Sequence, residues 1–260
     1  MERENNWSNI TLEEIRSILY ASNEGEAQKI IVQMQQDKRK GTQIIIAQYK
    51  KWLEKEHIEK ERIHKLWQLE RNLKTAGFKF IAGIDEVGRG PLAGPVVAAC
   101  VILPHELELP GLNDSKQIVA KERKILSEII KRKAVAWGIG VVDHQEVDRI
   151  NILQATKKAM VEAVKLIGQQ PDYLLIDALK IPVAIPQDAV VHGDTLSASI
   201  AAASIVAKTY RDSLMEMMDV LYPEYGFKEH KGYGTARHRE ALVRYGSCPI
   251  HRTSFLQNII

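Results

Sequence analysis

Four acidic side chains follow short apolar runs, at points where buried strands should end. They are Asp85 and Glu86 after residues 80–84, Asp177 after residues 173–176, and Asp194 shortly after residues 189–191. Carboxylates that gather at one edge of a sheet raise each other's pKa and resist ionisation. A hard divalent cation removes this conflict, because Mg²⁺ and Mn²⁺ prefer oxygen ligands and keep positions open for water and phosphate. The pattern therefore favours a divalent-metal site.

Taken singly, an Asp after a strand is more often a turn or helix-cap residue. The functional interpretation depends on four such acids together, including an adjacent Asp-Glu pair. Three other acids, Asp143, Asp148 and Asp212, fall in helical stretches, where we expect caps or salt-bridge partners.

A glycine-rich segment, GRGPLAG at residues 88–94, follows the first apolar run. A dinucleotide-binding loop needs Gly-x-Gly-x-x-Gly at the start of a helix. Here the third glycine is one residue late and the next segment is typical of a strand, so we expect a loop that joins two strands. Gly88 and Gly90 allow a ligand to approach the backbone closely. Arg89 between them indicates that this ligand is anionic.

Two further sets of residues suggest other chemistry, and we assign both to structural roles. The sets are His230, His238 and His251, and Ser197, Ser199 and Ser204. The histidines lack the cysteines or compact spacing of a zinc site, so we expect backbone contacts or loop structure. The serines lack the Gly-x-Ser-x-Gly elbow of a hydrolase, and small residues there let a helix pack closely on a sheet.

The elements that must position these residues alternate between strands and helices after residue 78. Apolar runs typical of strands occur at 80–84, 95–103, 135–142, 173–176 and 189–191, and helical spacing occurs at 118–133, 143–167, 196–221 and 235–245. The first two runs form a hairpin, and strands then interleave with helices. This order predicts an α/β fold with a mixed sheet flanked by helices.

Residues 1–74 are helical in pattern throughout. Thr11 and Glu14 form a capping box ahead of the first helical stretch, and two further stretches span about 24–38 and 42–74. We predict a helical N-terminal extension over 1–74 and a catalytic domain with a C-terminal helical segment over 75–260. The basic, Trp-containing helices could grip a nucleic-acid backbone, or they could form a solvated docking segment. A chain without residues 1–70 is expected to fold and to bind substrate more weakly.

The bulk properties are those of an ordinary globular protein. The 260 residues carry a net charge of +3 with a pI near 8.7, which permits a polyanionic partner without demanding one. Cys100 and Cys248 lie far apart and are expected to be reduced thiols. The first residues include acids and no apolar run, so we expect neither a signal peptide nor a membrane span, and a cytoplasmic location.

The segment GIDEVGRGPLAGPVV at residues 83–97 resembles the opening motif of the ribonuclease HII family. Six later blocks follow in that family's order: NDSK at 113–116, DYLLID at 172–177, GD at 193–194, SIAAASIVAK at 199–208, HKGYGT at 230–235 and HRTSF at 251–255. The resemblance covers residues 78–256. Seven blocks in the right order make it highly specific.

The resemblance implies a ribonuclease H-like fold, Mn²⁺ or Mg²⁺ as cofactor, and hydrolysis of RNA in RNA–DNA hybrids or at ribonucleotides embedded in duplex DNA. By motif position, the family's catalytic, metal-binding acids correspond to Asp85, Glu86, Asp177 and Asp194, its junction-reading loop to Gly88, Arg89 and Gly90, and its stacking tyrosine to Tyr233. The first 70 residues exceed the minimal family pattern, so the resemblance assigns them no role.

Two-metal hydrolysis at such a site leaves a 5′-phosphate and a 3′-hydroxyl. We expect Asp85 and Asp177 to be the central ligands, with Glu86 and Asp194 at the flanks. Lys116, after Asp-Ser in the second block, is a candidate phosphate contact. A surface lysine at the start of a helix is an equally good interpretation of that residue.

Two other classes of protein would share part of this pattern. A nucleic-acid-binding module with a degenerate site should lack one of the acids, and all four are present. A DNA-junction nuclease on the same fold has no need to read a ribose, whereas the glycine loop and Tyr233 suit that task. We therefore expect RNA–DNA hybrids and ribonucleotide-containing DNA as partners, and a monomer.

Overall fold

The structure is a computed structural model that describes residues 7, 10–35, 37–113, 115 and 117–257. The chain divides into two compact units, Met1–Arg62 and Ile63–Ile260. Within the described residues, no helix is long and apolar enough to cross a membrane.

The first unit is helical, as predicted. It contains α1 (Leu12–Ala21), α2 (Glu24–Met34) and most of α3 (Lys40–Leu66). The predicted capping box is confirmed, since the Glu14 amide donates to the Thr11 hydroxyl and the Thr11 amide donates to the Glu14 carboxylate. Apolar residues at helical spacing form its core, which includes Ile15, Leu19, Ala27, Ile31, Met34, Ile45, Ile46 and Tyr49.

The second unit begins within α3, and the long helix predicted over 42–74 is interrupted. The chain leaves α-helical geometry at Trp67 and resumes as α4 (Gln68–Thr75). Leu66 and Trp67 are buried in the core of the second unit. The C-terminal end of α3 therefore belongs to the same compact unit as the sheet. The domain boundary after residue 74 stays a prediction that truncation can test.

A five-stranded mixed sheet forms the centre of the second unit, in the order β3-β2-β1-β4-β5. The strands are β1 (Ile81–Val87), β2 (Val96–Ile102), β3 (Ala136–Val142), β4 (Tyr173–Asp177) and β5 (Gln187–Val190). The predicted hairpin is confirmed, because β1 and β2 are antiparallel. β4 runs parallel to β1, and β5 runs parallel to β4.

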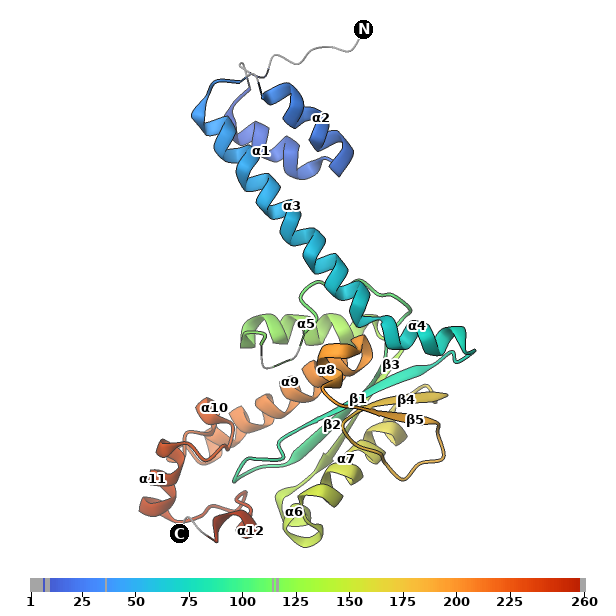
Figure 1. Ribbon diagram of the computed structural model, residues 1–260. Coiled ribbons are helices and arrows are strands. Elements are labelled where there is room, and N and C mark those ends of the chain that lie inside the picture. The colour runs from blue at the N-terminus through green and yellow to red at the C-terminus, as the bar shows by residue number, and fades with distance from the viewer. Residues whose placement is uncertain (1–6, 8–9, 36, 114, 116, 258–260) are drawn as a thin grey trace. The chain divides into compact units, whose positions relative to one another are not determined.

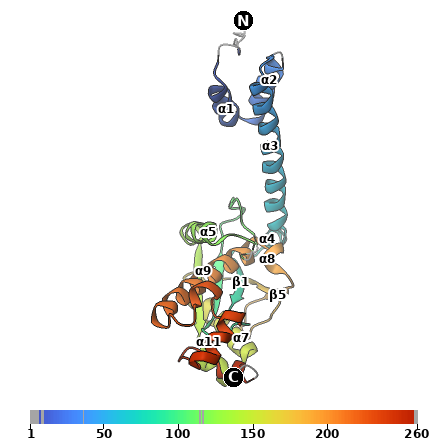
Figure 2. The same ribbon diagram turned by 90° about the vertical axis from the view of Figure 1, so that its left-hand side faces the viewer.

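Helices cover both faces of this sheet (Figure 1, and from the side in Figure 2). One face packs against α9 (Ala198–Leu221) and α5 (Ala120–Lys133), and the other against α7 (Ile152–Leu166). Gly83 on β1 allows α9 to approach closely, since a Cβ there would lie 2.0 Å from the Ser199 backbone. The small residues at the start of α9 thus let the helix lie directly on the strand that carries the acids.

Five shorter helices complete the second unit. They are α6 (His144–Ile150), α8 (Gly193–Leu196), α10 (Phe227–His230), α11 (Ala236–Tyr245) and α12 (Thr253–Leu256). The helix predicted over 143–167 is therefore split into α6 and α7, whereas the helix predicted over 196–221 is confirmed as α9 and is preceded by α8, which was not predicted. Asn151 separates α6 from α7 with a φ of 67°, and Ser197 separates α8 from α9 with extended backbone. Both residues cap the following helix with their side chains, and this local hydrogen bonding competes with helix continuation.

Candidate active site

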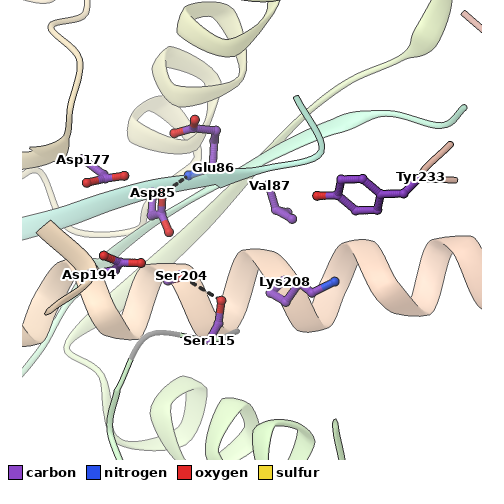
Figure 3. A pocket seen from close by; sticks show the side chains of 9 residues that line it. All are labelled: Asp85, Glu86, Val87, Ser115, Asp177, Asp194, Ser204, Lys208 and Tyr233. Carbon is purple, nitrogen blue, oxygen red and sulfur yellow. Dashed lines mark hydrogen bonds between the residues drawn. The ribbon is translucent and has the colours of Figure 1, made fainter. Parts of the chain in front are cut away.

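The acids predicted from the sequence line one pocket of about 360 Å³. Its lining comprises Asp85, Glu86, Val87, Ser115, Asp177, Asp194, Ser204, Lys208 and Tyr233. Figure 3 shows the four carboxylates toward one end and Lys208 and Tyr233 toward the other.

Asp85 and Asp177 lie within strands, whereas the sequence placed them just after the strand ends. β1 stays paired with β2 as far as Val87, and β4 stays paired with β5 at Asp177 itself. In the parallel pairing, Ile84 lies opposite Ile176, directly before the two aspartates. Because side chains alternate along a strand, Asp85 and Asp177 share the α9 face of the sheet. Backbone pairing therefore fixes both residues more firmly than a loop could.

Glu86 points to the opposite side of β1 from Asp85 (Figure 3). Adjacent residues of a strand project to opposite faces, so the Asp-Glu pair borders the pocket from two sides of the sheet. Asp194 approaches from a different element, the short helix α8 that follows β5. The Gly193 amide donates to Asp177 Oδ1 over 2.8 Å, which ties the turn before Asp194 to the end of β4.

Glu70 holds the segment that follows Asp194, at residues 197–199. No pattern in the sequence indicated a role for Glu70. Its carboxylate is buried and accepts hydrogen bonds from the Ser197 hydroxyl at 2.6 Å and the Ser199 amide at 2.9 Å. Ser197 in turn caps α9 by accepting from the Ile200 amide. A carboxylate at a helix N-terminus is stabilised by the aligned peptide dipoles. Residues from α4 thus support the segment that carries Asp194.

Burial and mutual repulsion dominate the electrostatics of the pocket. Burial raises the pKa of the Asp85 carboxyl well above its usual range, and the neighbouring Glu86 charge raises it further. Burial also raises the pKa of Glu86, against the opposing charge of Arg89. The Arg89 Nη1 lies 3.3 Å from Glu86 Oε1. Such a site holds its full negative charge only when a cation joins it.

The donor set fits a hard divalent cation. Carboxylate oxygens are the ligands that Mg²⁺ and Mn²⁺ prefer. Glu86 Oε2 is buried and has no hydrogen-bond partner within the described residues. One oxygen of Asp85 accepts from the Glu86 amide, and one oxygen of Asp177 accepts from Gly193, so backbone bonds orient both carboxylates. Among the described residues, no three His, Cys, Asp or Glu side chains are arranged so that they could together hold a metal ion.

The pocket also contains polar residues that the sequence did not single out for the site. Ser115 and Ser204 are buried and share a hydrogen bond of 2.9 Å between their hydroxyls. Lys208 lies one helical turn after Ser204 on α9, and its Nζ donates to Asp212 over 2.6 Å. Burial lowers the pKa of Lys208, against the pull of Asp212. The helical spacing Ser204 to Lys208 was the available signal, because residues four apart share a face.

The glycine loop lies beside the pocket without lining it, apart from its neighbour Val87. Gly88 has a φ of +95°, and a Cβ there would lie 2.3 Å from the Arg211 side chain, so only glycine fits. A Cβ on Gly90 would lie 3.7 Å from the Tyr233 ring, which places that ring next to the loop. Tyr233 is 42% exposed. Lys116, the fifth predicted substrate contact, lies outside the described residues.

The three histidines make structural contacts, as predicted. The Cys248 amide donates to His251 Nδ1, so His251 Nε2 carries the proton and donates to His238 Nε2 at 3.0 Å. His238 Nδ1 then donates to the Tyr233 carbonyl at 2.9 Å. Both rings are neutral in this chain of bonds, because protonating either one would set two N–H groups against each other. The chain supports the loop that carries Tyr233.

The chain matches family models over most of its length. Residues 82–258 match the model "Ribonuclease HII", and residues 11–74 match the model "Ribonuclease HII N-terminal domain". A ribonuclease HII from Desulfitobacterium hafniense is 50% identical over 242 residues, which cover 93% of each chain.

Solved structures show the same fold at lower identity. The ribonuclease H2 from Pyrococcus horikoshii OT3 superposes with a TM-score of 0.57 at 24% identity, over 68% of this chain and 93% of that one. Bst-RNase HIII in complex with Mn²⁺ superposes with a TM-score of 0.52 at 20% identity, over 70% of this chain and 63% of that one.

The mixed sheet with its flanking helices therefore has the ribonuclease H-like fold. The chain belongs to the ribonuclease HII family. It is accordingly a ribonuclease H, an endonuclease that acts on RNA paired with DNA.

Proposed function

We propose that this ribonuclease cuts RNA–DNA hybrids and also cuts duplex DNA at single embedded ribonucleotides. In both substrates it cleaves on the 5′ side of the phosphate, and this leaves 5′-phosphate and 3′-hydroxyl ends. Asp85, Glu86, Asp177 and Asp194 are the proposed metal ligands. Two bound divalent cations would supply an activated water and charge stabilisation for the leaving oxygen. The observation that carries the proposal is the convergence of these four carboxylates, from strands β1 and β4 and helix α8, on one pocket.

The protein groups of the pocket orient the substrate. Backbone hydrogen bonds orient the carboxylates of Asp85 and Asp177, which would therefore bind the cations with little reorganisation. Lys208 lines the same pocket, and its Nζ can donate to an oxygen of the phosphate next to the scissile phosphate. Arg89, which is half exposed beside Glu86, offers a second cationic group to the substrate backbone.

The ribose is read between the glycine loop and Tyr233 in this proposal. A protein distinguishes RNA from DNA at one position through the 2′-hydroxyl, which requires close approach of hydrogen-bonding groups. Gly88 and Gly90 lack the side chains that would prevent this approach. The exposed Tyr233 ring beside Gly90 provides a flat surface for the next sugar or base.

The cofactor is Mn²⁺ or Mg²⁺. The Mn²⁺ complex of the structurally similar Bst-RNase HIII supports this assignment, together with the all-oxygen donor set. All the proposed ligands and reading residues come from one chain, and we therefore propose that a monomer is active.

Cleavage of three end-labelled duplexes tests the proposal: all-DNA, DNA with one ribonucleotide, and an RNA–DNA hybrid. Each is incubated with Mg²⁺, with Mn²⁺ and with excess chelator. We expect cleavage of the last two duplexes in either metal and none in chelator. Full cleavage in chelator would exclude the metal mechanism, and equal cleavage of the all-DNA duplex would exclude ribose reading. An intact single-ribonucleotide duplex would restrict the enzyme to hybrids.

A further inference from the structure

Two arginines, Arg211 and Arg252, are completely buried next to the glycine loop. Arg211 lies on α9, and Arg252 precedes α12. Within the described residues, both guanidinium groups donate to backbone carbonyl oxygens and to no carboxylate. Burying a cation without a counter-charge is costly unless all its donors are satisfied. The burial of these two side chains is therefore expected to serve a specific structural role.

Arg252 uses its whole hydrogen-bonding capacity on one loop. Its Nε and Nη2 both donate to the Gly94 carbonyl, at 3.0 and 2.7 Å. Nη2 also donates to Gly88 at 2.6 Å, and Nη1 donates to Arg89 at 3.1 Å and Pro91 at 2.9 Å. A guanidinium has five N–H donors, and all five are engaged. A lysine, with three donors on one nitrogen, cannot replace this set.

Arg211 connects the same loop to the loop of Tyr233. Its Nε donates to the Pro95 carbonyl at 2.9 Å and its Nη2 to Ala93 at 3.1 Å. Its Nη1 donates to the Lys231 carbonyl at 2.9 Å. The loops also touch directly, since the Leu92 amide donates to the Gly232 carbonyl. Arg211 thus bridges residues 93–95 and residues 231–234.

The inward carbonyls determine where the loop amides point. The described residues contain no cis peptide bond, and in a trans peptide the N–H points away from the C=O. The Gly88 and Arg89 carbonyls face Arg252, so the amides of Arg89 and Gly90 face away from it. Neither amide donates a hydrogen bond within the described part of the chain. Two donors are thereby presented on the outer side of the loop, above a buried positive charge.

We propose that Arg211 and Arg252 are positioning residues that fix residues 88–95 and 231–234 as one rigid surface for reading the substrate. This inference rests on the proposed function of those loops. Both guanidiniums carry charge at neutral pH, because burial lowers the pKa of Arg252 only to about 9 and that of Arg211 only to about 10. Their charge adds to the attraction of the loop for a phosphate.

Arg252→Lys and Arg211→Lys test the proposal, with Arg39→Lys as a matched control. Arg39 also donates to two backbone carbonyls, those of Ile10 and Trp7, but it belongs to the first unit. For each full-length variant, three quantities are measured: amide hydrogen exchange by segment, Mn²⁺ affinity by calorimetry, and kcat and KM on the single-ribonucleotide duplex below the melting temperature.

We expect Arg252→Lys to accelerate exchange at the hydrogen-bonded amides of Leu92 and Gly94, and Arg211→Lys to accelerate it there and in residues 231–234, by at least about tenfold. Mn²⁺ affinity should stay at the wild-type value, because β1, β4 and α8 hold the carboxylates. KM should rise and kcat fall, with a combined loss near 10²-fold. Arg39→Lys should leave the loop exchange and both kinetic constants unchanged.

Uniformly faster exchange over the second unit, with wild-type kcat/KM per folded molecule, would show that the arginines only stabilise the fold and would overturn the proposal. Unchanged loop exchange would overturn it as well. If wild-type enzyme does not cut the single-ribonucleotide duplex, the proposed function fails in that respect. Loop exchange and the kinetic constants on the RNA–DNA hybrid then decide the inference separately.

Discussion

Asp85 and Asp177 lie side by side on parallel strands, one residue beyond the paired Ile84 and Ile176. Their backbones are fixed by the sheet, and one oxygen of each carboxylate is fixed by an amide. Two acids held this close cannot relax apart when metal is absent. Repulsion between them is therefore a permanent property of the metal-free fold, and it can be measured.

Replacing Asp177 by Asn removes a charge and keeps an acceptor for the Gly193 amide. We expect cleavage to fall more than about a thousandfold, equivalent to roughly 4 kcal/mol. The variant should melt in chelator at the wild-type temperature or above, since like-charge repulsion is relieved. Single-turnover cleavage and thermal melting in chelator provide the two measurements.

Asp188→Asn is the control, because Asp188 lies on the next strand and bonds the Tyr173 hydroxyl outside the pocket. A destabilised Asp177→Asn variant with normal activity per folded molecule would assign Asp177 a structural role.

The exposed Tyr233 ring should contribute to substrate binding by stacking. Tyr233→Ala is expected to lose about 1–3 kcal/mol of transition-state stabilisation on the single-ribonucleotide duplex. Its melting temperature should change little, since the ring is 42% exposed. Tyr233→Phe separates the roles: retained activity indicates stacking, and lost activity indicates a hydrogen bond from the hydroxyl. Tyr210, which is 37% exposed on α9 and outside the pocket lining, serves as control through Tyr210→Ala. Wild-type rates for Tyr233→Ala would remove this residue from the site.

The neutral histidine pair predicts a loss of stability in mild acid. Burial lowers the pKa of His238 to about 4, with His230 and His251 adding repulsion, and burial lowers the pKa of His251 as well. The unfolded chain, with histidine pKa values near 6.5, binds more protons than the folded one between pH 6.5 and 4. Stability is therefore complete above pH 6.5 and decreases as the pH falls toward 4.

Urea unfolding in chelator across pH 4.5–7.5 (about the range in which histidines titrate) measures this dependence. His251→Gln should flatten the slope, because one of the two titrating rings is gone. His57→Gln should keep the wild-type slope, since His57 lies in the first unit and pairs with the exposed Glu24. A His251→Gln variant with the wild-type slope would contradict the neutral pair, because the raised pKa values of Asp85 and Glu86 contribute with the opposite sign in both proteins and cancel in the comparison.

The structure favours deletion of residues 1–62 instead of residues 1–70. A chain that begins at Ile63 keeps Leu66 and Trp67 in the core and Glu70 on Ser197, and we expect it to fold. A chain that begins at Ala76 loses all three, and removal of the Trp67 side chain alone should cost about 3–5 kcal/mol. Thermal melting and Mn²⁺-induced stabilisation compare the two chains. Equal stability would show that α4 is dispensable and would support a boundary after residue 74.

The sequence by itself determined the elements and the chemistry of the site. Apolar runs located each of the five strands of the described sheet, helical spacing located the main helices, and the acids after three of the runs indicated the pocket that they line. These features are local, because strand alternation and turn residues depend on neighbours in the chain. The family resemblance added the roles of the loop residues, and the family itself is confirmed.

Only the tertiary structure decided which side chains support that site. Strand pairing carried β1 and β4 through the acids, and packing in the second unit ended α3 at Leu66. Glu70, Arg211 and Arg252 bond partners more than 100 residues away in the chain. No local pattern encodes such contacts, because they depend on how the whole sheet and its helices pack. Burial alone distinguishes these three from the many charged residues that stay in water.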